Sequence, residues 1–341
     1  MKSRSRRQKR QSQEELERQV RELLVEKGSK ALEQARNEVL QEHIECKEVR
    51  EALTYFITEY WQDLTRPTLI SLACEAVGGD QRLATRMAIP MILISGAIDI
   101  HDDIIDQSKV KGSRSTVLGK FGKDVALVAG DMLMVKGFTL LCEAIEKNVP
   151  AEKAARTILT IQKMFLELGD AEALELNFRG RTDITPQEYL SVVRKKAADV
   201  EAYTRISAIL GGGSKEEIEA LGEYGRLLGM MMILEDELMD VFDFRESVHR
   251  IKRECLPLPI VYALQNPTIR STISVALLKK SLKRKDGKTI LEVVEKSGSF
   301  EPVKKLMEEF AADAYNCTRN IKSDGRNLEL LAKTLLLSVD E

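Results

Sequence analysis

The longest apolar stretches of this chain end in acidic residues. From Gln81 to Ala97 the sequence is mostly apolar, and it then becomes acidic without a turn signal before Ser108. The stretch from Lys215 to Glu246 repeats this pattern, because an unbroken apolar run leads directly into Glu235 to Asp240. Apolar runs of this length are typical of buried helices. Both stretches are therefore predicted to be helices that begin in a core and end in charge.

The rest of the chain also has helical spacing of apolar residues. Further helices are predicted at Lys123 to Cys142 and at Gln187 to Leu210, and Thr65 to Pro67 is expected to open another. Glu14 to Val49 reads as one or two peripheral helices, with Gly28 as a plausible break. In all, roughly a dozen helices are expected, with no alternation of strands and helices and no fixed-period repeat. The predicted fold is all-α, a large helical bundle around a central cavity.

Composition narrows the class of protein and the kind of site. The 341 residues are 43% apolar and 31% charged with only 8 Pro, which favours helices joined by short polar turns. A net charge of −2 gives no general attraction to nucleic acid, and no such partner is expected. The 5 cysteines and 3 histidines are scattered, which argues against disulfides, structural zinc and a histidine-based triad. Any chemistry must rest on carboxylates and cations.

The first ten residues form a basic segment with six Lys or Arg and no acid. We expect residues 1–13 to be a disordered, solvated tail; contact with a membrane surface or a partner is the alternative. The sequence has no signal-peptide core and no run approaching the ~20 uninterrupted apolar residues of a membrane span. A cytoplasmic protein without a transmembrane segment is therefore expected, with residues 14–341 as a single helical domain.

Asp102, Asp103 and Asp106 form the first candidate site. On a helix the first and last of these lie four residues apart on one face, so they can hold hard cations between them. Three acids this close repel one another, and a helix tolerates them when a cation or a basic partner neutralises them. Because the preceding turn is apolar, we place the cluster at the rim of a cavity. A solvated helix end is the alternative.

A second acidic cluster strengthens the prediction of a metal site. Asp236 and Asp240 repeat the four-residue spacing after an apolar run. Two such clusters on helices of one bundle can face each other across a cavity and grip a polyanion through shared Mg²⁺, which takes one or two carboxylates per ion. Diphosphate is the natural ligand of that arrangement.

With these motifs the chain resembles the trans-isoprenyl diphosphate synthase (polyprenyl synthetase) family, from about Arg66 to Leu264. An HDDxxD motif with a spaced second acidic motif is a specific signal. The matching pieces are Arg66-Pro67, the run His101 to Asp106, Gly130-Asp131 with Met132-Leu133, Tyr189 with Lys195, and Gly229 ahead of Asp236 to Asp240. The resemblance implies an isoprenoid synthase fold and a geranyltranstransferase-like enzyme of isoprenoid biosynthesis, expected to be a homodimer.

In this family an allylic diphosphate, held by three Mg²⁺ ions between the two acidic motifs, ionises to an allylic carbocation. Isopentenyl diphosphate captures the cation, and a proton is lost. By family position the implied metal ligands are Asp102, Asp103, Asp106, Asp236 and Asp240. Lys195, with Lys196 beside it, is implied to contact the leaving diphosphate, and the implied catalytic residues are Asp102, Asp106, Lys195 and Asp236.

The family residues that bind isopentenyl diphosphate are largely replaced. Family members carry Lys and Arg shortly before Arg66 and a His before the first motif, where this chain has Asp63-Leu64 and Ser95. An acid at position 63 repels a diphosphate. The Arg pair that follows the motif becomes Lys111-Gly112, so Arg66 and Lys111 are left to bind this substrate, with Lys109 or Arg114 as further cations.

Three functions stay open at this point. The first is an active trans-prenyltransferase with an altered isopentenyl diphosphate site. The second is a weakly active or non-catalytic subunit of a heteromeric prenyl diphosphate synthase, paired with a complete synthase. The third is a terpene-synthase-like enzyme that acts on an allylic diphosphate alone.

Several residues near the motifs carry weaker expectations. In the family, side chains just before the first motif limit the product, and Ala97 with Ile98 is expected to leave a pocket deep enough for chains beyond C15. Asp99 is either a supporting acid or a neutral, hydrogen-bonded group. A solvated helix face is favoured for Glu172 and Glu175, and His101 is expected to pack and hydrogen-bond locally rather than act as a base.

Overall fold

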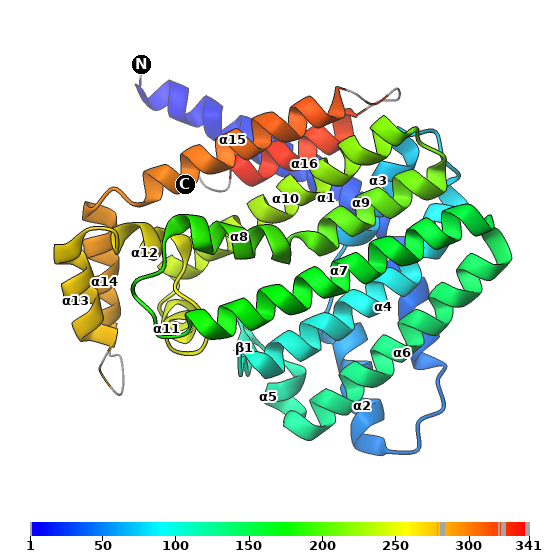
Figure 1. The fold of residues 1–341 in the computed structure, drawn as a ribbon, viewed down its shortest axis with the longest axis horizontal. Helices are drawn as coiled ribbons and strands as arrows, with labels where there is room; N and C mark the ends of the chain where they lie inside the picture. Colours follow the sequence, from blue (N-terminus) through cyan, green and yellow to red (C-terminus); the bar gives the residue numbers. More distant parts are fainter. Residues whose placement is uncertain (1, 278, 280–283, 320, 322–324, 338–341) are drawn as a thin grey trace.

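The structure, a computed structural model, is a bundle of long helices (Figure 1). It describes residues 2–277, 279, 284–319, 321 and 325–337. These residues form sixteen α-helices and one π-helix, and their only sheet is a two-stranded hairpin. The predicted all-α fold class is confirmed.

The elements of the first half are α1 (Lys2–Leu40), α2 (Lys47–Tyr55), η1 (Phe56–Tyr60), α3 (Thr65–Ala76), α4 (Gln81–Ile105), β1 (Val110–Lys111), β2 (Arg114–Ser115), α5 (Val117–Phe121), α6 (Lys123–Asn148) and α7 (Ala151–Phe178). Those of the second half are α8 (Pro186–Lys196), α9 (Ala198–Gly211), α10 (Lys215–Phe242), α11 (Phe244–Arg253), α12 (Leu258–Ala263), α13 (Pro267–Leu277), α14 (Arg284–Lys296), α15 (Phe300–Thr318) and α16 (Arg326–Leu337).

The core is built around α4, whose middle is buried on every side. It packs against α3, α6 and α9, and Ile92, Leu93 and Ile94 are completely buried. A helix enclosed by other helices has no solvent face to keep polar, which explains why its middle is mostly apolar. The other long apolar helix, α10, packs against α9 and α15. Because α9 contacts both helices, it ties the two halves of the bundle together (Figure 1).

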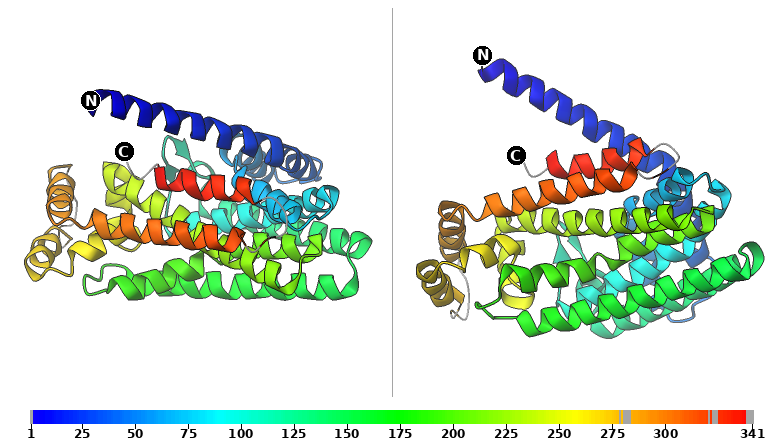
Figure 2. Two further views of the ribbon diagram at one scale, coloured as in Figure 1. Left: turned by 90° about the horizontal axis from the view of Figure 1, so that it is seen from above. Right: turned by 45° about the horizontal axis from the view of Figure 1, so that its top comes forward.

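The N-terminal helix differs from the sequence expectation. α1 is continuous from Lys2 to Leu40, so Gly28 does not break it. Instead Gly28 allows a close approach of α1 to α3, because an added Cβ atom would lie 2.8 Å from the carbonyl oxygen of Leu64. The basic segment, expected to be a disordered tail, is drawn as the first turns of α1, which project past the neighbouring helices (Figure 2).

Two helices predicted as single units are each divided, and both divisions matter for the site. The stretch Gln187 to Leu210 is interrupted at Ala197, where α8 gives way to α9. The stretch Lys215 to Glu246 ends at Phe242, because the Asp243 carboxylate accepts hydrogen bonds from the N–H groups of Arg245 and Glu246 and so caps α11. At Asp243, short-range capping therefore overrides the continuous helical spacing.

α4 and α6 are both long and apolar enough to cross a membrane by length and composition alone. In α4, 67% of the most apolar window is buried within the fold, which makes it the core helix of this bundle. In α6 the corresponding share is 33%, and Leu127, Val128 and Val135 expose their side chains.

A buried ion cluster joins α7, α9 and α10. The Arg226 guanidinium, 4% exposed, donates to Glu201 at 2.6 Å and lies 2.7 Å from the carboxylate of Glu167. Arg205 also donates to Glu201, at 3.1 Å. Burial alone raises the pKa of Glu201, but the ion pairs with Arg226 and Arg205 outweigh burial and lower it below the ordinary 4.5.

We predict that Glu201→Ala lowers the free energy of unfolding by about 3–5 kcal/mol, because it leaves the Arg226 charge buried with fewer partners. Urea unfolding at pH 7 measures this. Lys163→Met is the control: the Lys163 ammonium group lies 3.5 Å from Glu201 but the side chain is 60% exposed, so a loss of about 0–1 kcal/mol is expected. Equal losses for both variants would contradict the prediction.

The stabilisation by Glu201 should also depend on pH. Because the folded pKa of Glu201 is lowered, its contribution to the free energy of unfolding is complete above pH 4.5 and is lost as the pH falls through the folded value.

Candidate active site

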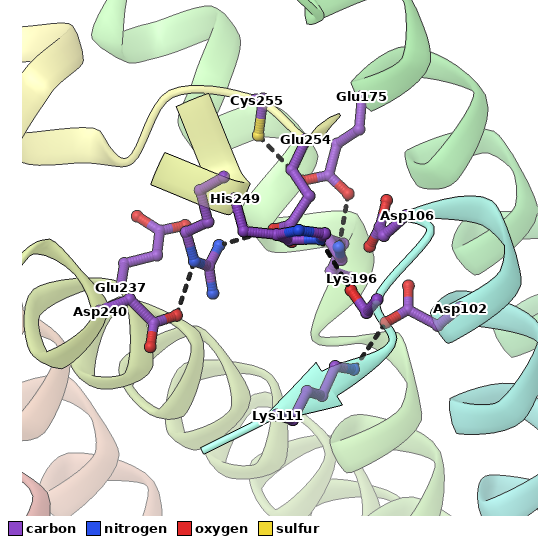
Figure 3. A network of polar contacts seen from close by, with 12 residues as sticks. Asp102, Asp106, Lys111, Glu175, Lys196, Glu237, Asp240, His249, Glu254 and Cys255 are labelled. Carbon is purple, nitrogen blue, oxygen red and sulfur yellow. Dashed lines mark hydrogen bonds and ion pairs between the residues drawn. The ribbon is translucent and has the colours of Figure 1, made fainter. Parts of the chain in front are cut away.

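The two acidic motifs end their helices at the same place in the bundle. Figure 3 shows Asp102 of α4 and Asp106, which follows α4, on one side and Glu237 and Asp240 of α10 on the other, with the basic side chain of Lys196 between them. The structure thus brings the two predicted clusters together. The ends of α7 and α8, the hairpin and α11 complete the surroundings (Figure 3).

The carboxylates of the first motif each hold a basic partner from another element. Lys111 on β1 lies 2.9 Å from Asp103 and 3.4 Å from Asp102. Asp106 accepts a hydrogen bond of 2.9 Å from Arg179, the residue that follows α7. Asp103 is almost fully buried, whereas Asp102 and Asp106 are partly exposed. Lys111, expected to bind substrate, therefore lies directly at the motif.

The pKa values of these carboxylates reflect crowding in a partly dry site. Burial and the neighbouring Asp102 and Glu254 raise the pKa of Asp106 to about 8. Burial also raises the pKa of Asp103 to about 6, against the opposing effect of Lys111. For Asp102, burial is outweighed by Lys111 and Lys196, and its pKa is lowered. Burial and mutual repulsion therefore disfavour the charged form of Asp103 and Asp106, whereas the neighbouring lysines favour it at Asp102.

The structure separates the two lysines at the end of α8. Lys195 turns to the outer surface, where it pairs with Asp170. Lys196 points to the site and pairs with Glu175 (Figure 3). It also pairs with Glu172, at 3.3 Å. Burial alone lowers the pKa of Lys196, but Glu175, Asp102 and Glu172 hold it well above its ordinary range. The cation at the carboxylates is thus Lys196 rather than the expected Lys195, and Glu172 and Glu175 belong to the site rather than to a solvated face.

The second motif divides into exposed and structural acids. Asp236 is exposed, and Asp240 lies 2.6 Å from the guanidinium of Arg250. Glu237 is 2% exposed, and both its oxygens are engaged: the Tyr189 hydroxyl donates to one at 2.5 Å and the Leu258 N–H to the other at 3.0 Å. Glu237 therefore fixes α10 to α8 and α12.

α11 and the hairpin are tied together beside the two motifs. The N–H of Gly112 donates to Glu246 at 3.2 Å, and the Ser108 hydroxyl lies 2.9 Å from His249 Nε2. On the same helix Arg250 pairs with Asp240 and, at 3.3 Å, with Glu254. α11 therefore links the segment that follows the first motif to the second motif through polar contacts.

The residues expected to bind isopentenyl diphosphate are occupied by other contacts. Arg66 lies between two carboxylates, 2.9 Å from Asp63 and 3.1 Å from Asp199. Ser95 hydrogen-bonds to the Tyr203 hydroxyl. A cavity of about 310 Å³ next to the first motif is lined by Tyr60, Trp61, Asp99, Asp103, Lys111 and Arg114. Arg66 is absent from that lining.

The turn of α4 before the first motif packs against Phe56 of η1. Ala97 is fully buried and Ile98 partly so, but a Cβ on Gly96 would lie 2.7 Å from the Phe56 ring, so an aromatic from the α2–η1 segment fills space on that side. Asp99 is hydrogen-bonded: the Trp61 indole donates to it at 2.6 Å. His101 lies 3.2 Å from Asp131 and packs against Gly130, as expected of a structural residue.

The donor set fits divalent cations of the hard type. All candidate ligands are carboxylate oxygens, the donors that Mg²⁺ prefers in proteins. In the described part of the chain no three acidic, His or Cys side chains converge on one point. Mg²⁺ does not need such a cage, because it takes one or two carboxylates and keeps several waters or substrate oxygens.

Sequence reasoning missed Arg179 and Arg250, and it did not single out Lys196. Arg179 belongs to no motif, and it reaches Asp106 across 73 positions of sequence. Arg250 follows Asp240 by 10 positions and also stands outside the motif. The sequence indicates only that the two motifs carry more acids than bases. Partly buried acids need basic partners, but the sequence does not say which elements supply them.

We predict that Glu237→Ala destabilises the protein while its neighbour Asp236→Ala does not. Removing Glu237 leaves the buried Tyr189 hydroxyl and Leu258 N–H without an acceptor, at about 1–3 kcal/mol each. Asp236 is exposed, so its removal should change the free energy of unfolding by about 0.5 kcal/mol or less. Urea unfolding of both variants measures the difference. A loss of stability in Asp236→Ala as large as in Glu237→Ala would contradict this division of roles.

Comparisons with known proteins agree with the geometry. The family model for polyprenyl synthetase matches residues 46–294. A short chain isoprenyl diphosphate synthase of Methanothermobacter thermautotrophicus is 32% identical over 242 residues, which cover 69% of this chain and 73% of that protein.

Solved structures share the fold along nearly the whole chain. Geranylgeranyl pyrophosphate synthetase from Pyrococcus horikoshii has a TM-score of 0.82 at 24% identity, covering 93% of this chain and 99% of that one. A polyprenyl synthase from Caulobacter crescentus complexed with calcium and isoprenyl diphosphate has a TM-score of 0.78 at 19% identity, covering 94% and 97%. The chain belongs to the polyprenyl synthetase family and is a prenyltransferase that condenses an allylic diphosphate with isopentenyl diphosphate.

Proposed function

We propose that the allylic diphosphate binds between the ends of α4 and α10 in this chain. The observation that carries the proposal is the pair of facing acidic motifs with basic side chains between them (Figure 3). The proposed metal ligands are Asp102, Asp103, Asp106, Asp236 and Asp240, and the proposed ions are Mg²⁺, three per site when diphosphate is bound. The Caulobacter crescentus structure, which shares this fold, contains calcium together with isoprenyl diphosphate, and this supports the pairing of a divalent cation with a diphosphate ligand.

In the proposed reaction, the steps are divided among bound cations, residues of the chain and the two substrates. Bound divalent cations would neutralise the charge that develops on the leaving diphosphate. Lys196, held by Glu172 and Glu175, donates to the departing oxygens as the allylic C–O bond breaks. The apolar part of α4 keeps water from the allylic cation. The double bond of isopentenyl diphosphate then forms the new C–C bond, and the released diphosphate takes the proton.

We predict that Lys196→Gln lowers kcat by about 100-fold or more, because it removes a positioned charge from the leaving group. Lys195→Gln is the matched control, since the adjacent lysine pairs with Asp170 at the surface. Steady-state turnover of the two variants measures the contrast. A large loss in Lys195→Gln with little change in Lys196→Gln would show that the roles are reversed.

The cavity beside the first motif is the proposed site of isopentenyl diphosphate. Lys111 and Arg114 supply positive charge on its wall, while Asp99 and Asp103 supply negative charge. Arg66 is withheld, because Asp63 and Asp199 engage its guanidinium. This arrangement supports a diverged site with weak affinity for the second substrate rather than a lost one.

We predict that Asp63→Asn lowers the KM for isopentenyl diphosphate on the order of tenfold, because one negative charge is removed and Arg66 is released from it. Asparagine keeps the side-chain oxygen that accepts the Thr65 N–H at 2.7 Å, so the start of α3 is preserved. Asp80→Asn is the control: the Asp80 carboxylate also accepts a backbone N–H two residues ahead, that of Arg82 at 2.8 Å at the start of α4, but it is exposed. An unchanged or higher KM in Asp63→Asn would sink the idea.

A second copy of the chain is the proposed partner for the exposed apolar side chains of α6 and α7. Val135 is 65%, Leu159 63% and Leu166 68% exposed, and the two helices touch through Phe138 and Phe165. Apolar side chains gathered on two neighbouring helices mark a surface that another protein covers. The homodimer and the cytoplasmic location stay predictions. Sedimentation of the purified chain distinguishes a dimer from a monomer that associates only with a second homologue.

The central test is an assay of the purified chain with radiolabelled isopentenyl diphosphate, Mg²⁺ and allylic primers from C5 to C20. Extended products from the chain alone are expected, and products beyond C15 would support the deep pocket inferred from Ala97. Extension only after a complete synthase is added would favour the subunit role. Diphosphate release without isopentenyl diphosphate would favour an enzyme that acts on the allylic substrate alone.

A further inference from the structure

Arg179 stands outside every recognised motif and yet holds the last acid of the first one. It follows α7 directly, and one of its terminal nitrogens, Nη2, donates to the Asp106 carboxylate at 2.9 Å and to the Ile105 carbonyl at 3.1 Å. Ile105 is the final residue of α4, so the guanidinium also lies at the negative end of that helix. One side chain therefore fixes both the end of α4 and the carboxylate that follows it.

The guanidinium keeps this position although one of its donors is unpaired. Four buried side-chain polar atoms in the described residues lack a well-directed hydrogen bond: His101 Nε2, Asp103 Oδ1, Thr157 Oγ1 and Arg179 Nε. Three of the four belong to the first motif or to its arginine, although His101 and Asp103 have ion pairs within 3.2 Å. A buried unpaired N–H is unfavourable. The contact with Asp106 is therefore formed although it leaves Arg179 Nε without a hydrogen bond.

A nearby arginine shows what an ordinary surface pair looks like in the same loop. Arg181 pairs with Asp183 at 2.9 Å, and these side chains are 42% and 65% exposed. For Arg179 and Asp106 the corresponding values are 28% and 15%. An exposed ion pair between long side chains rearranges freely and contributes little to stability. A partly buried pair that is also anchored to a backbone carbonyl restricts the orientation of the carboxylate.

We infer that Arg179 is a positioning residue for the reaction: it occupies one oxygen of Asp106 and holds the other for a divalent cation. This inference rests on the proposed allylic diphosphate site. Asp106 lies beside Lys196 (Figure 3), so a carboxylate without its anchor can turn to that lysine instead. Groups that hydrogen-bond metal ligands and orient them are known to affect metal affinity strongly.

The test compares Arg179→Gln, Arg179→Lys and the control Arg181→Gln. Mn²⁺ binding is measured by electron paramagnetic resonance with the full chain saturated with inorganic diphosphate. Arg179→Gln should weaken Mn²⁺ binding by about 10-fold to 100-fold. Arg179→Lys keeps the charge and should recover part of the loss, while Arg181→Gln should match the native protein. In turnover assays the Mg²⁺ concentration for half-maximal rate should rise in Arg179→Gln, with the KM for isopentenyl diphosphate unchanged.

Native-like Mn²⁺ binding in Arg179→Gln would overturn the inference, and so would tighter binding, which would make Arg179 a competitor of the metal. If Arg179→Gln fails to fold, Arg179→Lys decides. A Mn²⁺ affinity of Arg179→Lys equal to that of Arg181→Gln would overturn the inference, because charge alone would then be enough and the two hydrogen bonds of Arg179 would not be needed. The binding measurement does not require turnover. A native chain that binds Mn²⁺ with diphosphate but forms no product would therefore count against the proposed reaction and leave the role of Arg179 intact.

Discussion

Two buried apolar helices that end in clusters of like charge impose the main constraint on this structure. The carboxylates at the ends of α4 and α10 are only partly hydrated, so their repulsion is not screened as it would be in water. Four elements bring a cation to this region: the hairpin brings Lys111, the end of α7 brings Arg179, and α11 brings Arg250. The end of α8 brings Lys196, whose charge acts on Asp102 and Asp106. The site is thus an assembly of element ends, each with a charged partner.

This constraint also explains where several helices stop. The break at Ala197 places Lys196 at the end of α8 with Glu172 and Glu175, while α9 continues into the core. The cap at Asp243 ends α10 just after its acids and lets α11 present Arg250 to Asp240. Arg250 follows the break at Asp243, so a continuous α10 would carry this cation away from Asp240. The same positive charges are then available to a leaving diphosphate, so neutralising the motifs and assisting departure use one set of residues.

The sequence was sufficient for the helices and for the two acidic motifs, because both depend on local spacing. Asp102 with Asp106 and Asp236 with Asp240 could be paired from a four-residue period alone. It was not sufficient for their partners. Successive residues of a helix differ by about 100° around its axis, so the choice between Lys195 and Lys196 depends on how α8 is rotated. Arg179 and Arg250 act through contacts between elements far apart in sequence. Gly28 looked like a break because the close approach of Leu64 cannot be seen along the chain.

Near the proposed isopentenyl diphosphate site, acidic side chains surround an arginine, whereas at the two motifs basic side chains surround acids. Asp63, Asp199 and Asp99 together hold the pKa of Arg66 well above its ordinary value, although burial alone would lower it. Three acids around one arginine leave this corner net negative. The ion pair with Asp199 joins α3 to α9 and helps to fix the fold, but the same contacts remove the guanidinium from the cavity lined by Lys111 and Arg114. Affinity for isopentenyl diphosphate must then come from the hairpin, which also neutralises the first motif. Binding of the two substrates should therefore be coupled through Lys111, because cations that relieve Asp102 and Asp103 release this lysine for the second diphosphate.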